Sequence, residues 1–521
     1  MIRIRIFPTS IRNRDYEKLF IAGVATVTIG AILSACASRD AFEVTKGMVI
    51  QNATVVNTRD GSLASGMSVL IDEGKIQKIM AGRFIRLSGS AQAIDASGKY
   101  LVPGYLDMHT HAMSAADQQP TYWPLLIANG ITGIREMSGS AALIQRARQL
   151  NADRAAGRVD APEILMIPGD IFGGQAPTAP LAVQFVQQQK ANGADFIKIS
   201  AGARDPVLAI LGAAKNQGLT VAGHLVPSIS ALESSNAGWR AIEHLGAGWG
   251  LMLDCANDET SIRQAVLSGQ AARPPFPATF VLNPRIYDGA QNAQLYQRIF
   301  DTYSDAKCQS LSQAFVKNET WQVPTLIRLR TQNFGGDPLY RADPNLVYVD
   351  KTTRALWEKL GQDFVTTLPP AAVATLQQFY GLEKKVTQLM KQNGVKMLAG
   401  SDLGGIWVIP GFGLHQEFRE LAASGLAPHE VLQMTTLNGA QFLKREATMG
   451  TVDEGKNADL VLLDANPLVD VANLGKIAAV FLKGKYLSKD ALKKKKKDVA
   501  AEYEKQSVKT LESALYPAHK H

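Results

Sequence analysis

Histidines, one lysine and one aspartate stand at or near the ends of short apolar runs in this sequence. Two histidines share the run Leu106–His111 at a spacing of two. In a strand, this spacing puts both imidazoles on one face, while Met108 and Thr110 point outward. Neutral imidazole and carboxylate are ligands of divalent metal ions. The residues in such positions are His109, His111, Lys198, His224, His244 and Asp402.

Each member of this set has an ordinary structural explanation by itself. A buried histidine, a lysine whose ammonium reaches solvent and an aspartate that caps a helix are all common. Lys198, however, lies in the apolar stretch Phe196–Ile199, where burial of an unpaired ammonium is costly. Separate structural roles do not explain six such residues in corresponding positions, so the set predicts a metal centre.

The elements that must position these residues alternate between short strands and helices, which predicts parallel βα units. We expect eight strands, at 105–111, 131–137, 163–168, 195–200, 220–225, 241–245, 321–326 and 396–402. Eight units predict an α/β fold of the (β/α)8 TIM barrel type, whose active site lies at the carboxyl ends of the strands. Long gaps predict insertions near 250–320 and 327–390, over that mouth.

Stretches rich in β-branched residues lie on both sides of this region. Met48–Asn57 and Ser68–Ala81 precede it, and Ala458–Asp464 and Ile477–Leu487 follow it. Their composition predicts strands near both ends of the chain.

The ligand set resembles that of the amidohydrolase superfamily, most closely its imidazolonepropionase/prolidase-like branch. Three framing segments add to the resemblance: Leu101–Asp107, Ala399–Asp402 and Gly450–Leu460. The resemblance covers residues 47–487. It implies a barrel at 104–447 and a small β-sandwich domain formed by both chain ends, at 47–103 and 448–488.

The resemblance also implies a binuclear centre. The two histidines of the first run, with Asp402, would bind one divalent metal, and His224 and His244 would bind a second. Lys198, converted to a carbamate by carbon dioxide, would bridge the two ions. Zinc is the default for such ligands, with manganese, iron and cobalt left open. Hydroxide formed between the metals would attack a carbonyl, and Asp402 would transfer the proton to the leaving group.

We therefore expect hydrolysis of an amide bond in a small-molecule substrate, a dipeptide or an N-acyl amino acid. Three alternatives stay open. The same site could hydrolyse a cyclic amide, a lactone or an ester. The protein could be a mononuclear deaminase or imidazolonepropionase, in which Lys198 has no metal role. It could also be a non-catalytic metal-binding lipoprotein.

Four further residues are candidates for substrate contact. Arg328 and Arg330 follow the expected seventh strand, and they share a face if the chain stays extended. Arg204 follows the fourth strand. Each arginine could bind a substrate carboxylate bidentately, although a solvated loop arginine is the commoner case. His415 follows the eighth strand, where a histidine on a surface helix explains it equally well.

Residues 1–35 predict an export signal. A basic start is followed by the uncharged stretch Leu19–Ala35. Leu33-Ser34-Ala35-Cys36 resembles the lipobox of bacterial lipoproteins, which implies cleavage before Cys36 and a lipid anchor on its thiol. No aspartate follows the cysteine, so we expect the periplasmic face of the outer membrane rather than the inner membrane. An uncleaved membrane anchor is the alternative.

Composition and charge exclude other classes. Hydrophobic residues make up 46% of the chain and charged residues 20%, which is a globular composition rather than a disordered one. The net charge of +8 is carried by residues 1–35 and by Lys493–Lys497. The rest of the chain sums to zero, so no nucleic-acid partner is expected.

The remaining segments carry less information. Residues 36–46 are expected to be a tether and 489–521 a basic, helical tail. Cys255 and Cys308 could pair in an oxidising periplasm or stay as free buried thiols. An oligomer is left open.

Overall fold

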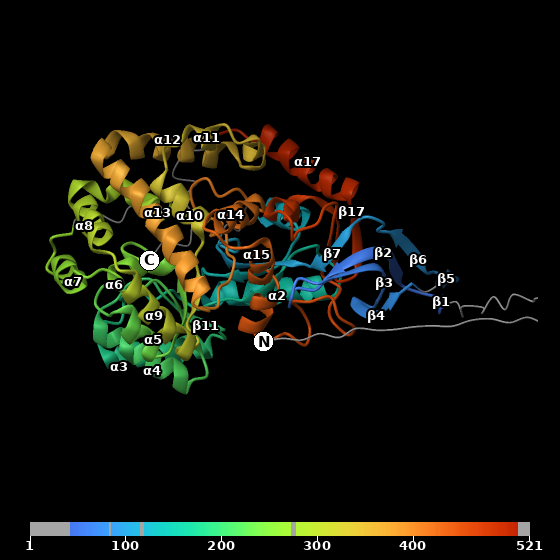
Figure 1. Ribbon diagram of the computed structural model, residues 1–521, viewed down its shortest axis with the longest axis horizontal. Coiled ribbons are helices and arrows are strands. Elements are labelled where there is room, and N and C mark those ends of the chain that lie inside the picture. The colour runs from blue at the N-terminus through green and yellow to red at the C-terminus, as the bar shows by residue number, and fades with distance from the viewer. Residues whose placement is uncertain (1–41, 83–84, 115–118, 272–277, 509–521) are drawn as a thin grey trace, which may run out of the picture.

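A computed structural model describes residues 42–82, 85–114, 119–271 and 278–508 (Figure 1). The expected signal segment and Cys36 lie outside these residues. Across the described ranges, no helix has both the length and the apolar character needed to cross a membrane. Figure 1 shows a β-rich end, mainly blue, beside a larger and mostly helical body.

Strands from both ends of the chain form one eight-stranded sheet, in the order β17-β16-β15-β7-β2-β3-β4 with β6 beside β2. Its strands are β2 (Met48–Val56), β3 (Leu63–Asp72), β4 (Lys75–Ala81), β6 (Gln92–Asp95), β7 (Tyr100–Pro103), β15 (Leu460–Leu463), β16 (Ile477–Leu482) and β17 (Lys485–Ser488). Its apolar face includes the buried side chains of Val69, Leu101, Leu460 and Phe481. The strands expected near both chain ends are therefore present. Two short strands, β1 (Phe42–Val44) and β5 (Ile85–Leu87), pair separately.

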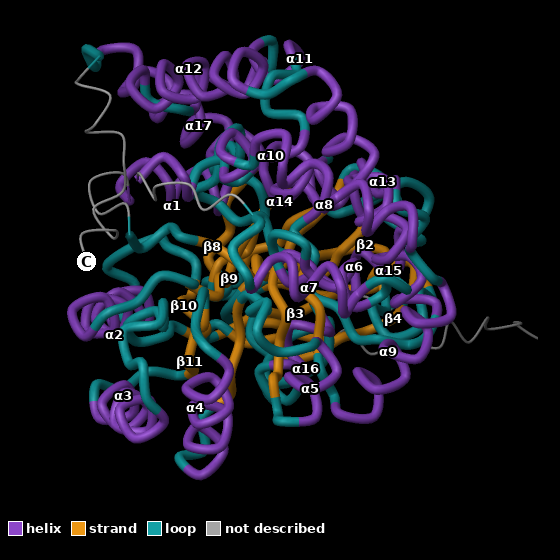
Figure 2. The backbone as a smooth tube through the Cα atoms, turned by 90° about the vertical axis from the view of Figure 1, so that its left-hand side faces the viewer, coloured by secondary structure: helices purple, strands orange, loops and turns teal. Residues whose placement is uncertain are grey.

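Seven parallel strands form two further sheets, at the centre of the view in Figure 2. One sheet holds β8 (Tyr105–Thr110), β9 (Ile131–Glu136) and β10 (Glu163–Met166); the other holds β11 (Phe196–Ile199), β12 (Thr220–Gly223), β13 (Trp239–Glu243) and β14 (Trp321–Val323). Each strand begins at or within two residues of its predicted position. All neighbours in these sheets are parallel, so their carboxyl ends lie at a common edge.

Helices surround these strands (Figure 2). The helices outside the two long insertions are α1 (Gln119–Ala128), α2 (Ala141–Ala155), α3 (Ala179–Ala191), α4 (Arg204–Asn216), α5 (Ala231–Asn236), α14 (Phe412–Ala423), α15 (Pro428–Met434) and α16 (Leu437–Phe442). Serine side chains start two of them. Ser140 accepts the backbone N–H of Leu143 in α2, and Ser230 accepts that of Glu233 in α5.

The eighth expected strand, 396–402, is not a strand. Isolated β-bridges join this part of the chain to β14 on one side and to β8 on the other. Another bridge joins Pro168, after β10, to β11, so the seven strands and this segment follow one another in a ring. The backbone N–H of Ser401 donates to the carboxylate of Asp107 at 2.9 Å, and Asp402 has a φ of 53°. A side-chain acceptor and a left-handed residue interrupt the extended chain here. The protein is thus an α/β protein, and the predicted continuous eight-stranded barrel is not resolved.

The long gaps after β13 and β14 are helical. The first holds α6 (Gly250–Asp254), α7 (Glu259–Leu267), α8 (Gly289–Thr302) and α9 (Asp305–Asn318). The second holds α10 (Leu326–Asn333), α11 (Pro338–Arg341), α12 (Lys351–Thr367) and α13 (Pro370–Gln392). Cys255, which follows α6, and Cys308 of α9 form a disulfide, and both are fully buried. Of the two alternatives for these cysteines, the pair is the one observed.

Helix α17 (Lys489–Lys505) occupies the first part of the expected C-terminal tail. Its Leu492, Val499 and Tyr503 are buried, and the hydroxyl groups of Tyr503 and Thr121 lie 2.5 Å apart. One face of this basic helix is therefore packed against α1, so the helix is not solvated on all sides.

Candidate metal centre

The predicted ligands lie at the carboxyl ends of the parallel strands or directly after them. Lys198 is within β11, and the others occupy strand ends or the first residues beyond: His109 at the end of β8, His111 after it, His224 after β12, His244 after β13 and Asp402 in the segment that follows β14 in the ring. Strands far apart in the sequence thus bring these side chains to one edge.

One neighbour of these ligands departs from the expected alternation. Met108 was expected to face outward, but it is buried in a cluster with Phe196 and Trp321 from other strands. The pairing of β8 with β9 is irregular between Asp107 and Thr110, so strict alternation fails there.

The carboxylate of Asp402 lies among three imidazoles. Its Oδ1 is 3.4 Å from Nε2 of His109 and 3.3 Å from Nε2 of His111. Its Oδ2 is 3.8 Å from Nε2 of His244. The ligand atoms of His109, His111 and Asp402 all lie within 4.8 Å of one another, so a single cation could contact all three.

The other ring nitrogen of each imidazole also has a partner. The Nδ1 contacts are His109 with Glu243 at 2.7 Å, His111 with Ser138 at 2.6 Å and His244 with Thr325 at 2.5 Å. Hydrogen bonds of this kind fix the orientation of metal-binding histidines. They leave each Nε2 facing the carboxylate.

The donor set fits a divalent metal ion. Nε2 of His109 is fully buried and has no hydrogen-bond partner among the described residues. A buried polar atom without a partner is costly, and a cation at this nitrogen would satisfy it. Two imidazole nitrogens and one carboxylate oxygen are the protein ligands of many catalytic zinc sites.

His224 and Lys198 lie beside this group. The ring centroids of His224 and His244 are 5.2 Å apart. Lys198 is only 3% exposed. Burial lowers the pKa of Lys198 to about 8, although the carboxylates of Asp402, Glu243 and others oppose this shift. His224 is thus a neighbour of His244, and Lys198 interacts electrostatically with Asp402 and Glu243.

Burial also sets the charges of the site. It lowers the pKa of His109, His224 and His244 well below the usual value, so these imidazoles are neutral and able to bind a cation. Burial by itself would raise the pKa of Asp402, but contacts with the surrounding imidazoles hold it well below its usual range. Asp402 is therefore a carboxylate.

The backbone is strained at the same positions. His244, Thr325 and Asp402 have φ values of 55°, 46° and 53°, in the left-handed region that non-glycine residues rarely occupy. Such residues cost of order 1–3 kcal/mol each and cluster at functional sites. A Cβ at Gly400 would lie 2.7 Å from Cβ of His109, so only glycine allows the segment to pass this histidine closely.

A family model described as the Amidohydrolase family matches residues 382–487. Curated relatives match over short stretches. An adenine deaminase of Listeria welshimeri is 36% identical over 87 residues, which are 17% of this chain and 14% of that protein. A dihydroorotase of Carboxydothermus hydrogenoformans is 45% identical over 65 residues, which are 12% of this chain and 14% of that protein. Over these segments the chain resembles amidohydrolases. It spans only a small part of the length of these curated relatives.

Solved amidohydrolase structures share the fold over most of the chain. Bottromycin amidohydrolase has a TM-score of 0.65 at 16% identity and covers 87% of this chain and 90% of its own. A Xaa-Pro dipeptidase with bound methionine gives 0.58 at 17% identity, with 85% and 99% covered. A putative prolidase from Bifidobacterium longum gives 0.55 at 20% identity, with 87% and 100% covered. At these identities the likeness shows the fold alone.

The condition under which Arg328 and Arg330 would share a face, an extended chain, is not met. Helix α10 begins at Leu326, and the carboxylate of Glu417 accepts the N–H of Ile327 in its first turn at 2.7 Å. A side-chain acceptor at a helix N-terminus satisfies a backbone N–H that has no partner within the helix, which stabilises the helix. Because residues two apart on a helix point to different sides, the two arginines do not share a face.

Arg328 instead reaches the candidate metal centre through Asp402. Its Nε lies 3.0 Å from Oδ2 of Asp402, and its Nη1 donates to the carbonyl of Leu282 at 2.5 Å. Its Nη2 donates to the carbonyl of Val281. A Cβ at Gly405 would lie within 3 Å of the guanidinium, so this glycine leaves room for it. The donors of Arg328 are engaged within the protein.

The other substrate candidates lie elsewhere. Arg330 contacts Glu420 at 3.3 Å. Arg204 is half exposed and pairs with Glu233 on the surface. The structure brings neither arginine to the three-ligand group.

His415 has a structural role. Its Nε2 lies 2.9 Å from the carbonyl oxygen of Asn129, and its ring makes edge contacts with Tyr105 and Phe418. Burial lowers its pKa to about 4. This histidine joins α14 to the end of α1 and faces no candidate ligand.

Two buried carboxylates of the site were missed in the sequence. Asp107 accepts hydrogen bonds from the backbone N–H and the hydroxyl of Ser401, at 2.9 and 2.6 Å. Glu136 accepts the backbone N–H groups of Met113 and Ser138, at 2.8 and 2.9 Å. Burial raises the pKa of both acids to about 7. Both acids hold loops that follow the ligand-bearing strands. An acidic residue inside an apolar strand is the feature of the sequence that could have revealed them.

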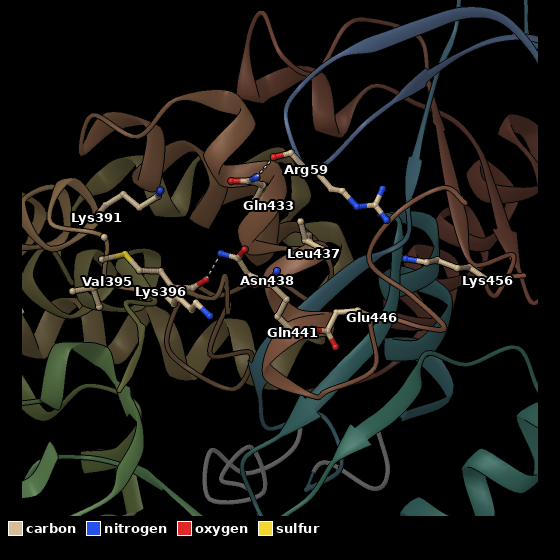
Figure 3. A pocket seen from close by; sticks show the side chains of 12 residues that line it. Arg59, Lys391, Val395, Lys396, Gln433, Leu437, Asn438, Gln441, Glu446 and Lys456 are labelled. Atoms are coloured by element: carbon tan, nitrogen blue, oxygen red, sulfur yellow. Dashed lines mark hydrogen bonds between the residues drawn. The ribbon is translucent and has the colours of Figure 1, made fainter. Parts of the chain in front are cut away.

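A cavity of about 500 Å³ lies away from this centre, at the beginning of the segment that ends in Asp402 (Figure 3). Asn438 donates there to the carbonyl of Met397 at 2.8 Å. Two of its cations are paired, Arg59 with Asp453 and Lys391 with Glu430. The predicted ligands do not line this cavity, and its basic groups are largely neutralised, so it is not a candidate active site.

Proposed function

We propose that this amidohydrolase cleaves an amide (carbon–nitrogen) bond in a dipeptide or an N-acyl amino acid, with the help of divalent metal ions. The observation that carries the proposal is the convergence of His109, His111 and His244 on the carboxylate of Asp402. The fold shared with proteins named as a Xaa-Pro dipeptidase and a prolidase supports this substrate class.

Two metal ions, zinc by default, belong to the proposal. The three-ligand group would hold one ion and His224 with His244 the other. A carbamate formed on Lys198 by carbon dioxide would lie between them. The buried lysine supports this, because a pKa of about 8 leaves roughly a tenth of the amine neutral at pH 7, and only the neutral amine reacts with carbon dioxide. When bound, a divalent metal supplies a Lewis acid and lowers the pKa of water toward about 7.

Residues of the chain itself would move the proton. Asp402 is ionised, so a carboxylate oxygen can accept a proton from the attacking water. As the new carbon–oxygen bond forms and the carbon–nitrogen bond breaks, the same carboxyl group would protonate the departing nitrogen. Arg328, 3.0 Å from Oδ2, favours the ionised form of Asp402 before the attack.

We also propose that the protein is exported and anchored by a lipid on Cys36, at the periplasmic face of the outer membrane. The disulfide between Cys255 and Cys308 supports export, because such bonds persist in oxidising compartments. A small molecule is the proposed substrate, nucleic acid is not a proposed partner, and self-association stays open.

The decisive experiment is metal analysis of the purified protein together with turnover of a substrate panel. The panel contains dipeptides, N-acyl amino acids, a cyclic amide, a lactone and adenine. We expect two metal ions per chain and release of a free amino acid from the first two classes. Turnover of adenine alone, with one ion bound, would favour the mononuclear deaminase. A protein without turnover on any substrate would favour the non-catalytic alternative.

Lys198→Ala tests the carbamate within the same experiment. We expect loss of bound metal and of nearly all turnover, with partial rescue by formate or acetate in the vacated position. Lys190→Ala, on the exposed surface of α3, is the matched control. Full metal content and near-normal activity in Lys198→Ala would mean that a single-metal site operates.

A further inference from the structure

We infer that Arg135 and Glu243 form a positioning pair that holds His109 in one tautomer, with its Nε2 lone pair directed at the metal position. The inference rests on the proposed metal centre. Neither residue is a proposed ligand, and each comes from a different sheet: Arg135 from β9 and Glu243 from β13.

The contacts form a continuous chain. Oε2 of Glu243 lies 2.7 Å from Nδ1 of His109, and Oε1 accepts a hydrogen bond from Nη2 of Arg135 at 2.5 Å. Nε of Arg135 donates to the carbonyl oxygen of Met108 at 2.6 Å. The pair therefore contacts both the imidazole of His109 and the backbone directly before it.

Glu243 decides which nitrogen of His109 carries the proton. A carboxylate is only an acceptor, so Nδ1 must donate to it, and in the neutral ring Nε2 then holds the lone pair. The same Nε2 is the buried nitrogen that has no hydrogen-bond partner among the described residues.

The other two imidazoles around Asp402 have a different kind of partner. Nδ1 of His111 faces the hydroxyl of Ser138, and Nδ1 of His244 faces that of Thr325. A hydroxyl can donate or accept, so it does not select a tautomer. Nδ1 of His109, in contrast to a hydroxyl contact, faces the charged carboxylate of Glu243.

Stability alone does not account for the pair. The side chains of Arg135 and Glu243 are 1% and 0% exposed. Removing two charges from water is expensive, and a buried ion pair can often be replaced by apolar residues without loss of stability. The rings of Phe196 and Phe442 lie 5.7 and 5.2 Å from the guanidinium and help to exclude water. The orientation of His109 is the gain that the geometry shows.

The test measures zinc affinity by competition with a chromophoric chelator, beside thermal unfolding, for the full chain. We expect Glu243→Gln to lower zinc affinity by about 10- to 100-fold, the usual cost of losing such a contact. Asp459→Asn is the matched control, because Asp459 pairs with Arg154 at 2.7 Å with both side chains largely buried, but outside the centre. We expect this control to lose stability and keep its zinc affinity.

The double variant Arg135→Met with Glu243→Gln separates positioning from folding. It contains no unpaired buried charge, so its unfolding temperature should recover toward that of the wild type. Its zinc affinity should stay low, because the amide of glutamine does not select a tautomer. Recovery of zinc affinity together with stability would show that the pair is merely structural. Wild-type affinity in Glu243→Gln would overturn the inference, whereas a wild type that binds no metal would overturn the proposed function.

Discussion

Replacing both Cys255 and Cys308 with alanine should destabilise the helical insertion that follows β13. Their disulfide joins the end of α6 to α9 across 53 residues of sequence. This bond restricts the unfolded chain, so its removal increases the entropy of the unfolded state. The insertion begins shortly after His244, and its loosening should therefore also reach the metal centre.

The loop length sets the size of the effect. In the chain-entropy model, closing a loop of 53 residues lowers the unfolded-state entropy by an amount worth about 4 kcal/mol at 25 °C. A loss of this size raises the population of the opened insertion by about 1000-fold. Limited proteolysis that follows this population should accelerate by a similar factor.

The assay compares the wild type with the double variant by urea unfolding and by the rate of cleavage between residues 250 and 320. Each single variant also lacks the bond, so the difference between a single and the double variant measures the effect of the second alanine substitution itself. A reductant should not affect the folded wild type, because both sulfur-bearing residues are fully buried. A double variant that unfolds within about 1 kcal/mol of the wild type, and is cleaved no faster, would refute the loop-entropy reasoning.

Three further predictions concern the site and its surroundings. Arg328→Met removes the cation that lies 3.0 Å from the carboxylate of Asp402, so kcat should fall at least about tenfold and the acid limb of the pH profile should move to higher pH. The control is Arg204→Met at an exposed position, which should leave kcat and KM for carboxylate-bearing substrates unchanged. Burial lowers the pKa of His415 to about 4, from about 6.5 in the unfolded chain, so its contribution to stability of up to ~3 kcal/mol is complete above pH 6.5 and is lost as the pH falls toward 4. In urea unfolding, the free energy of unfolding of the wild type should therefore fall more steeply on acidification than that of His415→Asn. Parallel curves for the two proteins would contradict this. Gly400→Ala places a methyl group 2.7 Å from Cβ of His109, so zinc affinity in a chelator competition should drop, and an unchanged affinity would show that the segment can move aside.

The strand ends that carry the candidate ligands could be predicted from the sequence, because each follows from local chemistry. His224 and His244 end short apolar runs, and Lys198 breaks one, so strand ends could be located without knowledge of the pairing. Parallel strands then bring their carboxyl ends together.

The residues that hold those ligands could not be assigned in the same way. Asp107, Arg135 and Glu243 lie within strands, and their partners come from segments far away in the sequence. Local spacing does not reveal such a partner. A charged residue in an otherwise apolar strand indicates a buried polar contact. This pattern led to the prediction for Lys198, but the same pattern at the other three residues was not interpreted.

Two expectations failed because a distant contact overrides local preference. The stretch that starts at Leu326 is helical, since a carboxylate from α14 accepts N–H groups at its start. The segment before Asp402 keeps backbone hydrogen bonds to β14 and β8 but is not a regular strand, since Asp107 takes the N–H of Ser401. Both contacts join parts of the chain that are remote in sequence.

The pairing of β7 with β15 has a consequence for how this protein is made. Leu460 lies opposite Pro103 in the eight-stranded sheet. At ~5–20 residues per second, the roughly 360 residues between these strands take about 20–70 s to synthesise. During that time β7 lacks its partner on one side, and an unpaired strand edge is a template for association with other chains.

The nascent chain therefore carries an aggregation hazard that the finished fold does not. Many contacts of this sheet are also remote in sequence, which slows folding once synthesis is complete. A chain truncated before β15 would turn β7 from an interior strand of the sheet into an exposed edge, and it should aggregate rather than fold as a shorter version of the protein.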